Sequence, residues 1–400
     1  MSDSEPVGEP VRRLRIALGM SQTELAERAG VSAGAMSMIE TNRLSATSEV
    51  IESLADVLDC TPAYLRGAPH EAVVGRPWLR AYADAPSRVV ERVLSDSVTA
   101  VSAAEALKLR FVADDVPAFD GDLNDDDEIE EFATLVRVQA GVTEDAVIGN
   151  AIRAAERLGC VVLPMDSELG RHLGISTRVN SVPVIRVSRP GSADGRGVPG
   201  DRQRFTVAHE LGHLALHHAR RPPDSASDAA KIEKQAHRFA AAFLAPAEPL
   251  LTDFDRLGGR ATLSVLAELK EVWGIAIKAL VLRLRHLSVI DDDHARSLYK
   301  QISARGWNKN EPVPVATESA VWLQKALKQR FGGVGDPTDR ACVELGLGRG
   351  HFERWITWSV AAEQHQSVAP VVDFTRRESS GSEGRQRQGD ATITRLPVRR

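Results

Sequence analysis

Two histidines and a glutamate stand in the spacing H-E-x-x-H, within the run R-F-T-V-A-H-E-L-G-H. The surrounding pattern is helical, which places His209 and His213 one turn apart, about 6 Å along the axis and on one face. Both imidazoles can then reach one zinc ion, since a zinc–nitrogen bond is about 2.1 Å long. Glu210 lies about 100° around the helix, where its carboxylate can take a proton from a water that the metal activates. The spacing predicts a hydrolytic zinc site.

A catalytic zinc site needs a third protein ligand. His217 continues the histidine row, but on a straight helix it lies about 12 Å from His209, too far to share the ion, so we place it beside the site or on the surface. The H-x-x-G-x-x-H continuation of metzincins is absent. The next helical run, residues 229–244, offers Glu233 and His237 one turn apart on the same face. Either of these two side chains can reach the zinc.

The N-terminal residues 11–67 read as short helices joined by a tight turn. Ser21 and Glu24 have the spacing of a capping box, Gly30 ends the second helix in a left-handed turn, and Ser32 can cap the third. This is the arrangement that holds one helix out to enter the major groove of DNA.

The run S-Q-T-E-L-A-E-R-A-G-V-S, with the M-I-E-T-N-R that follows, resembles the XRE (Cro-type repressor) helix-turn-helix family. The resemblance implies that Gln22 and Arg43 contact phosphates. It places on or near the groove-facing side Ser32, Ala33, Ala35, Met36 and Ser37. This helix start lacks the Arg, Asn or Gln that reads base edges bidentately, so we expect weak or mainly backbone-directed binding. The alternative is that this fold serves as a dimerisation or protein-docking module. Because XRE modules often bind palindromic DNA as dimers, we also expect a homodimer.

A second resemblance covers about residues 150–290. The runs R-F-T-V-A-H-E-L-G-H-L-A-L-H-H and I-E-K-Q-A-H-R-F-A-A-A-F-L-A-P, with G-I-S at 174–176 upstream, are similar to the ImmA/IrrE family of zinc metallopeptidases. The resemblance implies that Glu233 is the third zinc ligand. Gln235 stands where the family often has a second acid and His237 where it often has Asn, so His237 competes as a ligand or as a partner that orients Glu233. It also implies a repressor or antitoxin protein as substrate, cleaved in a stress or mobile-element response.

The elements that must position these residues are mostly helices. Helical patterns cover 203–218, 229–244, 262–273 and 277–287, and residues 160–164 and 182–187 are β-rich. The predicted fold class is therefore mainly α with a small α+β metallopeptidase domain: an N-terminal helix-turn-helix bundle, and a zincin-like H-E-x-x-H helix packed on a short sheet. Because the run 182–187 precedes the active helix, we hypothesise that it receives an extended substrate by strand addition.

The chain divides into five predicted regions. They are a helix-turn-helix DNA-binding domain (1–68), a helical linker with an acidic hinge (69–131), the metallopeptidase domain (132–290), a C-terminal helical region (291–365) and a disordered tail (366–400). The hinge rests on residues 114–131, which hold ten acids and no bases and should be solvated and partly disordered until a helix begins near Ile129. Removing ten negative charges from the net −5 leaves +5, so the acidic average does not exclude DNA binding.

Composition limits the classes of protein to which this chain can belong. The three cysteines lie far apart in sequence, which argues against a disulfide framework or a thiolate zinc ribbon and favours a reducing compartment. The N-terminal residues do not form a signal peptide, and no stretch approaches about 18 uncharged apolar residues. We expect a cytoplasmic protein with no membrane partner.

These features predict a DNA-binding transcriptional regulator with zinc-dependent endopeptidase activity toward a repressor or antitoxin protein. One alternative is a transcription factor whose peptidase-like domain is a non-catalytic sensor, which the intact H-E-x-x-H argues against. The other is a toxin–antitoxin component whose helix-turn-helix is autoregulatory, which the flanking genes would identify.

Overall fold

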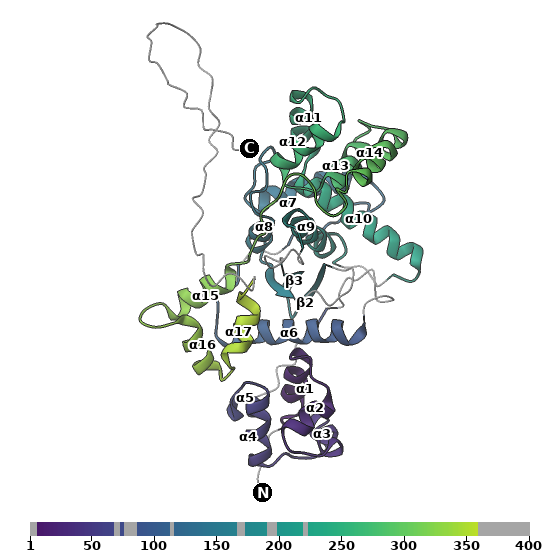
Figure 1. Ribbon diagram of the computed structural model, residues 1–400. Coiled ribbons are helices and arrows are strands. Elements are labelled where there is room, and N and C mark those ends of the chain that lie inside the picture. Colours follow the sequence, from purple (N-terminus) through teal and green to yellow (C-terminus); the bar gives the residue numbers. More distant parts are fainter. Residues whose placement is uncertain are drawn as a thin grey trace, which may run out of the picture. The chain divides into compact units, whose positions relative to one another are not determined.

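The computed structural model describes residues 6–67, 73–75, 86–112, 116–165, 173–189, 198–218 and 223–358 (Figure 1). The predicted tail at 366–400 and most of the loop at 190–200 lie outside these residues. Over the described part the fold is mainly helical with one three-stranded sheet, as the sequence predicts. No helix among these residues combines the length and the apolar character needed to cross a bilayer.

The N-terminal bundle holds five helices: α1 (Gly8–Ala17), α2 (Gln22–Arg28), α3 (Ala33–Glu40), α4 (Ser48–Val57) and α5 (Pro62–Arg66). The predicted caps are present. The Ser21 hydroxyl accepts the Glu24 amide at 3.1 Å, the Ser32 hydroxyl accepts the Ala35 amide at 3.2 Å, and Gly30 has a φ of +69°. These caps fix the angle between α2 and α3, because they satisfy amides that a helix start leaves without partners.

The sheet comprises β1 (Val161–Met165), β2 (Gly174–Val179) and β3 (Val182–Ser188) in the order β1-β3-β2. β3 pairs in parallel with β1 and antiparallel with β2. The sequence indicates β1 and β3 to within a residue but misses β2. Since β3 is hydrogen-bonded on both sides, the hypothesis that it receives a substrate by strand addition is wrong.

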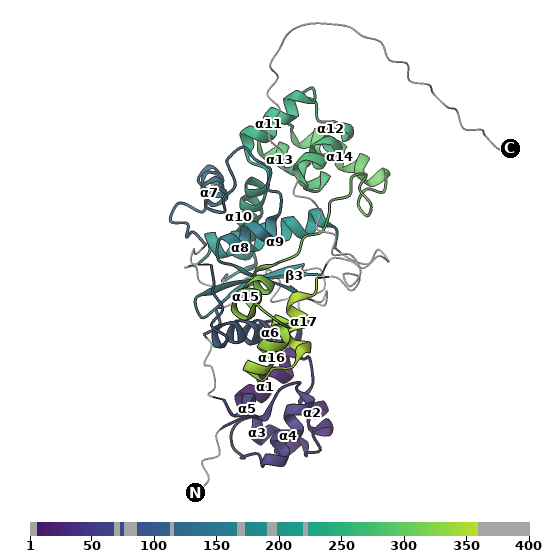
Figure 2. The ribbon, with the colours of Figure 1, turned by 90° about the vertical axis from the view of Figure 1, so that its left-hand side faces the viewer.

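Helices cover both faces of this sheet (Figure 2). One face carries α8 (Ala151–Arg157) and α9 (Gly200–Leu216), with α7 (Asp126–Gln139) and α10 (Ala226–Leu244) packed outside them; α6 (Ser87–Ala106) crosses the other face. Side chains of β1 alternate accordingly: Val162 joins the core of α7–α10, whereas Val161 and Leu163 join the core that includes α6 and the N-terminal bundle. Burial on both faces explains why β1 reads as an unbroken apolar run.

The core formed by α7–α10 continues into α11 (Ala247–Arg256), α12 (Leu263–Trp273), α13 (Ile277–His286) and α14 (Asp292–Ala304). The fully buried Arg283 of α13 donates to the Ala245 carbonyl at 3.0 Å and pairs with Glu130 of α7 at 2.6 Å. One guanidinium therefore satisfies a carbonyl at the end of α10 and ties that helix to α7 and α13.

The acidic run is anchored to this core by its apolar residues. Val116 and Phe119 are buried, and the Phe119 amide donates to the Ala215 carbonyl at 3.0 Å. Helix α7 begins at Asp126 rather than near Ile129, with acids in its first turn, where the helix dipole favours negative charge. Most of the acids are exposed to solvent, as the sequence predicts, whereas the buried Val116 and Phe119 and the early start of α7 differ from a partly disordered stretch. Residues 114 and 115 lie outside the described part.

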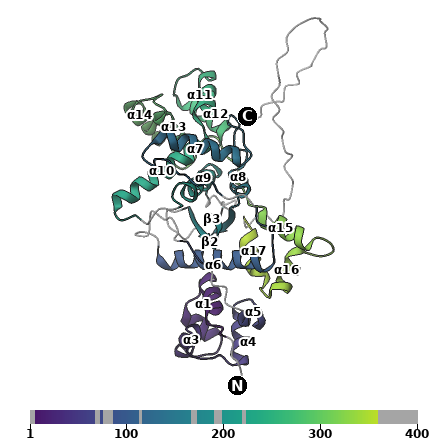
Figure 3. The same cartoon turned by 180° about the vertical axis from the view of Figure 1, so that it is seen from behind.

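Three C-terminal helices, α15 (Trp322–Phe331), α16 (Pro337–Leu345) and α17 (Arg349–Ile356), lie beside one end of α6 (Figure 3). They are hydrogen-bonded to the N-terminal bundle just after α4. The Thr61 amide donates to the Gly346 carbonyl at 2.7 Å, and Asp59 accepts the Gly348 and Gly350 amides at 2.7 and 3.2 Å. Helix α17 also contacts β1, so it bridges the bundle and the sheet.

A buried histidine of this bridge should make stability depend on pH. His351 Nε2 donates to the Leu58 carbonyl at 2.9 Å, and its Nδ1 accepts from Arg354 at 2.9 Å, so the neutral ring satisfies both contacts. Burial, then the charge of Arg354, lowers the pKa of His351. The unfolded chain, with a histidine pKa near 6.5, binds the proton more readily, so stability is present above about pH 6.5 and lost as pH falls.

Urea unfolding between pH 7.5 and 5 measures this effect. We expect the free energy of unfolding to fall with pH in the wild type, with His351 contributing up to about 1.4 kcal/mol per pH unit. The His351→Gln protein should show a flatter dependence, while His294→Gln, on the exposed surface of α14, should follow the wild type. Parallel curves for the wild type and His351→Gln would contradict the prediction.

Candidate metal centre

The predicted zinc-site residues lie on two adjacent helices. Helix α9 carries His209, Glu210 and His213, and α10 carries Glu233 and His237. Gly212, inside H-E-x-x-H, permits their close approach. A Cβ atom there would lie 2.9 Å from the Phe239 ring and 3.3 Å from the Ala236 carbonyl of α10.

Two imidazole nitrogens and two carboxylate oxygens lie close together between these helices. His209 Nε2 and His213 Nε2 lie 3.0 Å apart, and each is 3.4 Å from a different carboxylate oxygen of Glu233. Atoms bonded to one tetrahedral zinc at 2.0–2.1 Å are about 3.3–3.4 Å apart. The separation between each imidazole nitrogen and its carboxylate oxygen therefore matches that of two ligand atoms on one zinc.

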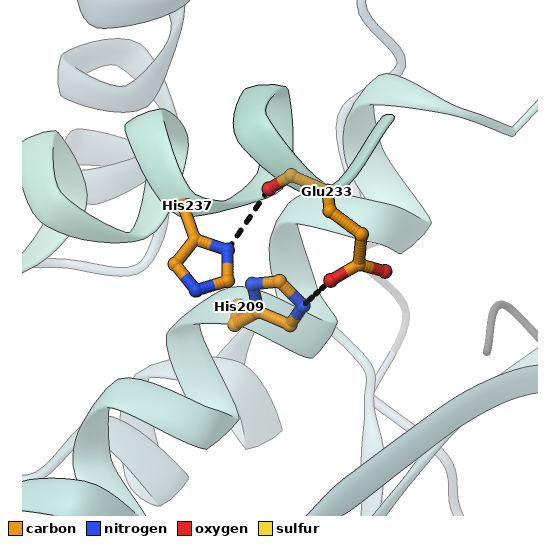
Figure 4. Close-up of side chains that lie close together, drawn as sticks. All are labelled: His209, Glu233 and His237. Atoms are coloured by element: carbon orange, nitrogen blue, oxygen red, sulfur yellow. Dashed lines mark hydrogen bonds and ion pairs between the residues drawn. The ribbon is translucent and has the colours of Figure 1, made fainter. Parts of the chain in front are cut away.

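His237 lies beside these donor atoms. Its Nδ1 donates to the main-chain carbonyl of Glu233 at 2.9 Å, and its ring stands edge-on to that of His209 at 4.5 Å (Figure 4). His209, Glu233 and His237 each offer a donor atom within 4.8 Å of the others, so this group can also hold a metal. The contact to the carbonyl uses one nitrogen of His237 to hold the backbone of α10.

The electrostatics favour a cation. Burial, only partly offset by Glu233, lowers the pKa of His213 to about 4, so this ring is neutral at pH 7 with a lone pair available. Burial raises the pKa of Glu233, but the adjacent His209 and His213 outweigh it and hold the pKa well below its usual range. A neutral His213 imidazole beside an ionised carboxylate is the combination of protonation states that metal binding requires.

A chain of buried hydrogen bonds orients His213. The Gln235 amide donates from Nε2 to the Leu123 carbonyl at 2.7 Å, which turns its Oε1 toward His217 Nε2 at 3.1 Å. His217 Nε2 therefore donates, and its Nδ1 accepts from His213 Nδ1 at 3.1 Å. His213 then directs Nε2 toward Glu233. His217 is fully buried beside the site, one of the two places that the sequence allows for it.

Glu210 faces the sheet. Its carboxylate accepts the Ser176 hydroxyl at 2.6 Å, and burial, opposed by His209 and Ser176, raises its pKa to about 7. Gly174 makes room: a Cβ there would lie 2.5 Å from Thr206 and 2.9 Å from Glu210 Cγ. The sequence indicates no role for Ser176, because strand β2 that carries it was not predicted.

Two family models match the chain. Residues 155–285, which include all of the metal-centre residues on α9 and α10, match the IrrE N-terminal-like domain. Residues 11–65 match a helix-turn-helix domain. The chain therefore contains one region similar to each of these two domains. No curated protein and no solved structure matches it.

The IrrE N-terminal-like domain is of the metallopeptidase type, which implies a metal cofactor, and the helix-turn-helix domain supports DNA binding. Within the latter, the Met36 side chain is fully buried in the bundle, so its prediction as a DNA contact is wrong. Gln22 donates to the buried Glu40 at 2.8 Å, which ties its amide to the bundle. Exposed residues at the surface of α3 and its flanks include Ser32, Ala33, Ser37, Met38 and Arg43, whereas Ala35 is half-buried. Met38, 44% exposed, was not predicted.

Proposed function

We propose that this protein is a DNA-binding regulator and a zinc endopeptidase, with His209, His213 and Glu233 as zinc ligands and Glu210 as the catalytic acid–base. The observation that carries the proposal is the cluster of donor atoms: the two imidazole nitrogens lie 3.0 Å apart and each lies 3.4 Å from one carboxylate oxygen of Glu233, distances that suit ligands of a tetrahedral zinc. His237 is assigned to orienting Glu233, since its Nδ1 is bonded to the carbonyl of that residue.

Residues of the chain transfer the proton and orient the ligands. When bound, zinc would polarise the scissile carbonyl and lower the pKa of a water molecule. Glu210 takes the water's proton on its carboxylate and delivers it to the leaving amine nitrogen. Ser176 holds that carboxylate through its hydroxyl, and His217 with Gln235 keeps His213 Nε2 directed at the carboxylate of Glu233.

The proposed substrate is a repressor or antitoxin protein, cleaved in a stress or mobile-element response in the cytoplasm. The helix-turn-helix domain supports this choice, because binding to DNA brings the peptidase domain close to DNA-bound proteins. We also propose that the protein acts as a homodimer, since helix-turn-helix domains of this kind bind two-fold symmetric sites in pairs.

Metal analysis combined with a cleavage assay tests the enzymatic proposal. The purified full chain should contain about one zinc per molecule, and it should cleave a helix-turn-helix repressor or antitoxin encoded beside its gene. A zinc chelator should stop cleavage, and added zinc should restore it. Stoichiometric zinc without cleavage of any neighbouring repressor or antitoxin would favour the non-catalytic sensor. Absence of zinc would contradict the site itself.

DNA binding is tested on the exposed face of α3. Ser37→Glu places a negative charge where we propose that phosphates and bases approach, and should weaken binding to duplex DNA at low salt by about tenfold or more. Fluorescence anisotropy with a duplex from the region upstream of the gene measures the affinity. Ser264→Glu, exposed on the distant α12, adds the same charge and should bind like the wild type. Equal affinity of all three proteins would favour a docking role for the domain.

A further inference from the structure

A short segment of the chain lies against the outer edge of β2, the strand that carries Ser176. It comprises residues 73–75, between α5 and α6, and is called the edge segment below. The Gly75 amide donates to the Arg178 carbonyl at 2.7 Å, and the Asn180 amide donates to the Val73 carbonyl at 2.7 Å. An antiparallel bridge lies between these two contacts. The edge segment is therefore paired with β2 on the side opposite β3.

The backbone of β2 leads from the edge segment to Glu210. Along a strand, every second residue directs its N–H and C=O to the same side, so Ser176 follows Arg178 at this outer edge. The Ser176 amide accordingly donates to the Glu210 carboxylate, beside the bond from its hydroxyl. Two residues of a strand span about 6.6 Å. The edge segment thus pairs with β2 one step away from Ser176, and its chain direction runs toward that residue.

An extended substrate can be hydrogen-bonded beside Glu210 at the same edge. Strand β3 has no free edge, since it pairs with β1 and β2. On β2, the outer backbone groups of Gly174 and Ser176 make no backbone hydrogen bond within the part of the chain that the structure describes. A peptide that pairs there lies next to the carboxylate of Glu210. If its strand continues past Arg178, it must take over the hydrogen bonds of the edge segment.

The edge segment is held mainly by polar contacts. The Thr177 hydroxyl donates to the Gly75 carbonyl at 2.6 Å, and the Val73 amide donates to Asn180 Oδ1 at 3.1 Å. Val73 is 72% exposed and Val74 is 38% exposed, so little apolar surface adds to these bonds. A substrate strand replaces the main-chain hydrogen bonds that it displaces. The edge segment can therefore exchange with a substrate without loss of backbone pairing.

We propose that the edge segment competes with the substrate for the outer edge of β2 and thereby holds back peptide cleavage. This inference rests on the proposed peptidase function, because it concerns access to the same metal centre. The edge segment follows α5, the last helix of the N-terminal bundle, and precedes α6, which crosses the sheet. Access of a protein substrate is thus controlled by the connection between the helix-turn-helix domain and the sheet.

Weakening the edge segment should speed cleavage. Gly75→Pro removes the amide that donates to Arg178. Asn180→Gly removes the acceptor for the Val73 amide and tolerates the φ of +55° at that position. Each variant should raise kcat/KM for the neighbouring repressor or antitoxin by about fivefold or more, through KM with kcat unchanged, because only access changes. Asn310→Gly, at an exposed position after α14, should behave like the wild type.

A disulfide makes the opposite change. Val74 and Val179 are the non-hydrogen-bonded pair of the bridge, whose Cα atoms lie about 4.5 Å apart, within disulfide range. The double variant Val74→Cys with Val179→Cys should form this crosslink on oxidation, which mass spectrometry of the full chain detects without any cleavage assay. Cleavage should fall by about tenfold or more and recover on reduction. Val74→Cys alone should stay active under oxidation.

Hydrogen exchange follows the displacement directly. In the Glu210→Gln protein, added repressor should speed exchange in peptides that cover residues 73–75 and slow it in peptides that cover β2. The proposal fails if both weakened variants cleave at the wild-type rate, if the crosslinked protein stays active, or if bound repressor leaves exchange at 73–75 unchanged. Absence of cleavage by every protein, the weakened variants included, would instead refute the peptidase function, and the competition with it.

Discussion

Glu210→Gln should lower the rate of peptide cleavage by about 10²–10⁴-fold, the usual contribution of a general acid–base, while the zinc content stays at the wild-type level. The amide keeps the size of the side chain and can still accept the Ser176 hydroxyl, which bonds the carboxylate at 2.6 Å in the wild type. It cannot take a proton at neutral pH. The loss should therefore appear in the rate of the chemical step, with little change in metal binding.

The comparison needs a neutral control. Glu248, exposed on α11, gives a matched Glu→Gln change that should leave cleavage unchanged. Single-turnover cleavage of the same repressor by each zinc-loaded protein separates chemistry from product release. Equal rates for Glu210→Gln and wild type would remove Glu210 from the mechanism. Loss of zinc in Glu210→Gln would give this residue a structural role in place of a catalytic one.

The second large effect concerns the third ligand. Glu233→Ala should reduce zinc affinity by well over 100-fold, because its carboxylate oxygens each lie 3.4 Å from a histidine Nε2 and supply the third ligand. His237→Ala should cost no more than the 10–100-fold or so typical of residues that orient a ligand. Competition with a chromophoric chelator measures both affinities.

The two variants also control for each other, since both truncate a side chain on the same helix, one turn apart. If His237→Ala loses as much zinc affinity as Glu233→Ala, the third ligand must be reassigned to His237 or shared. If Glu233→Ala keeps its zinc, the zinc is not bound by His209, His213 and Glu233 together. Circular dichroism of the apo forms should show that α10 is intact in both proteins.

The parts of this protein that could be predicted from sequence depend on short-range spacing. The one-turn separation of His209 and His213 follows from helix geometry alone, and the caps of the helix-turn-helix depend on neighbours within four residues. The choice of Glu233 over His237 as third ligand required a resemblance, because helix geometry places both side chains on the same face of the next helix.

The predictions from sequence fail where tertiary packing decides which residues are buried. Strand β2 was missed because its residues, G-I-S-T-R-V, alternate in neither polarity nor size, although nearly all are buried. Ser176 was missed with it. The acids at 126–128 lie at the surface, as the sequence suggests, but they already form the first turn of α7, which the sequence places nearer Ile129. Met36 matches a groove-facing position by pattern, yet its side chain fills the bundle interior.

The sheet covered on both faces has a consequence for any attempt to divide the protein. Cutting at the predicted boundaries and expressing residues 132–290 alone would remove α6 and the C-terminal helices. Val161, Leu163, Val179 and Val184, each at most 3% exposed in the full chain, would then face water. An apolar strand surface of that kind promotes self-association. The peptidase fragment should therefore aggregate, and an active fragment would have to include residues 87–358.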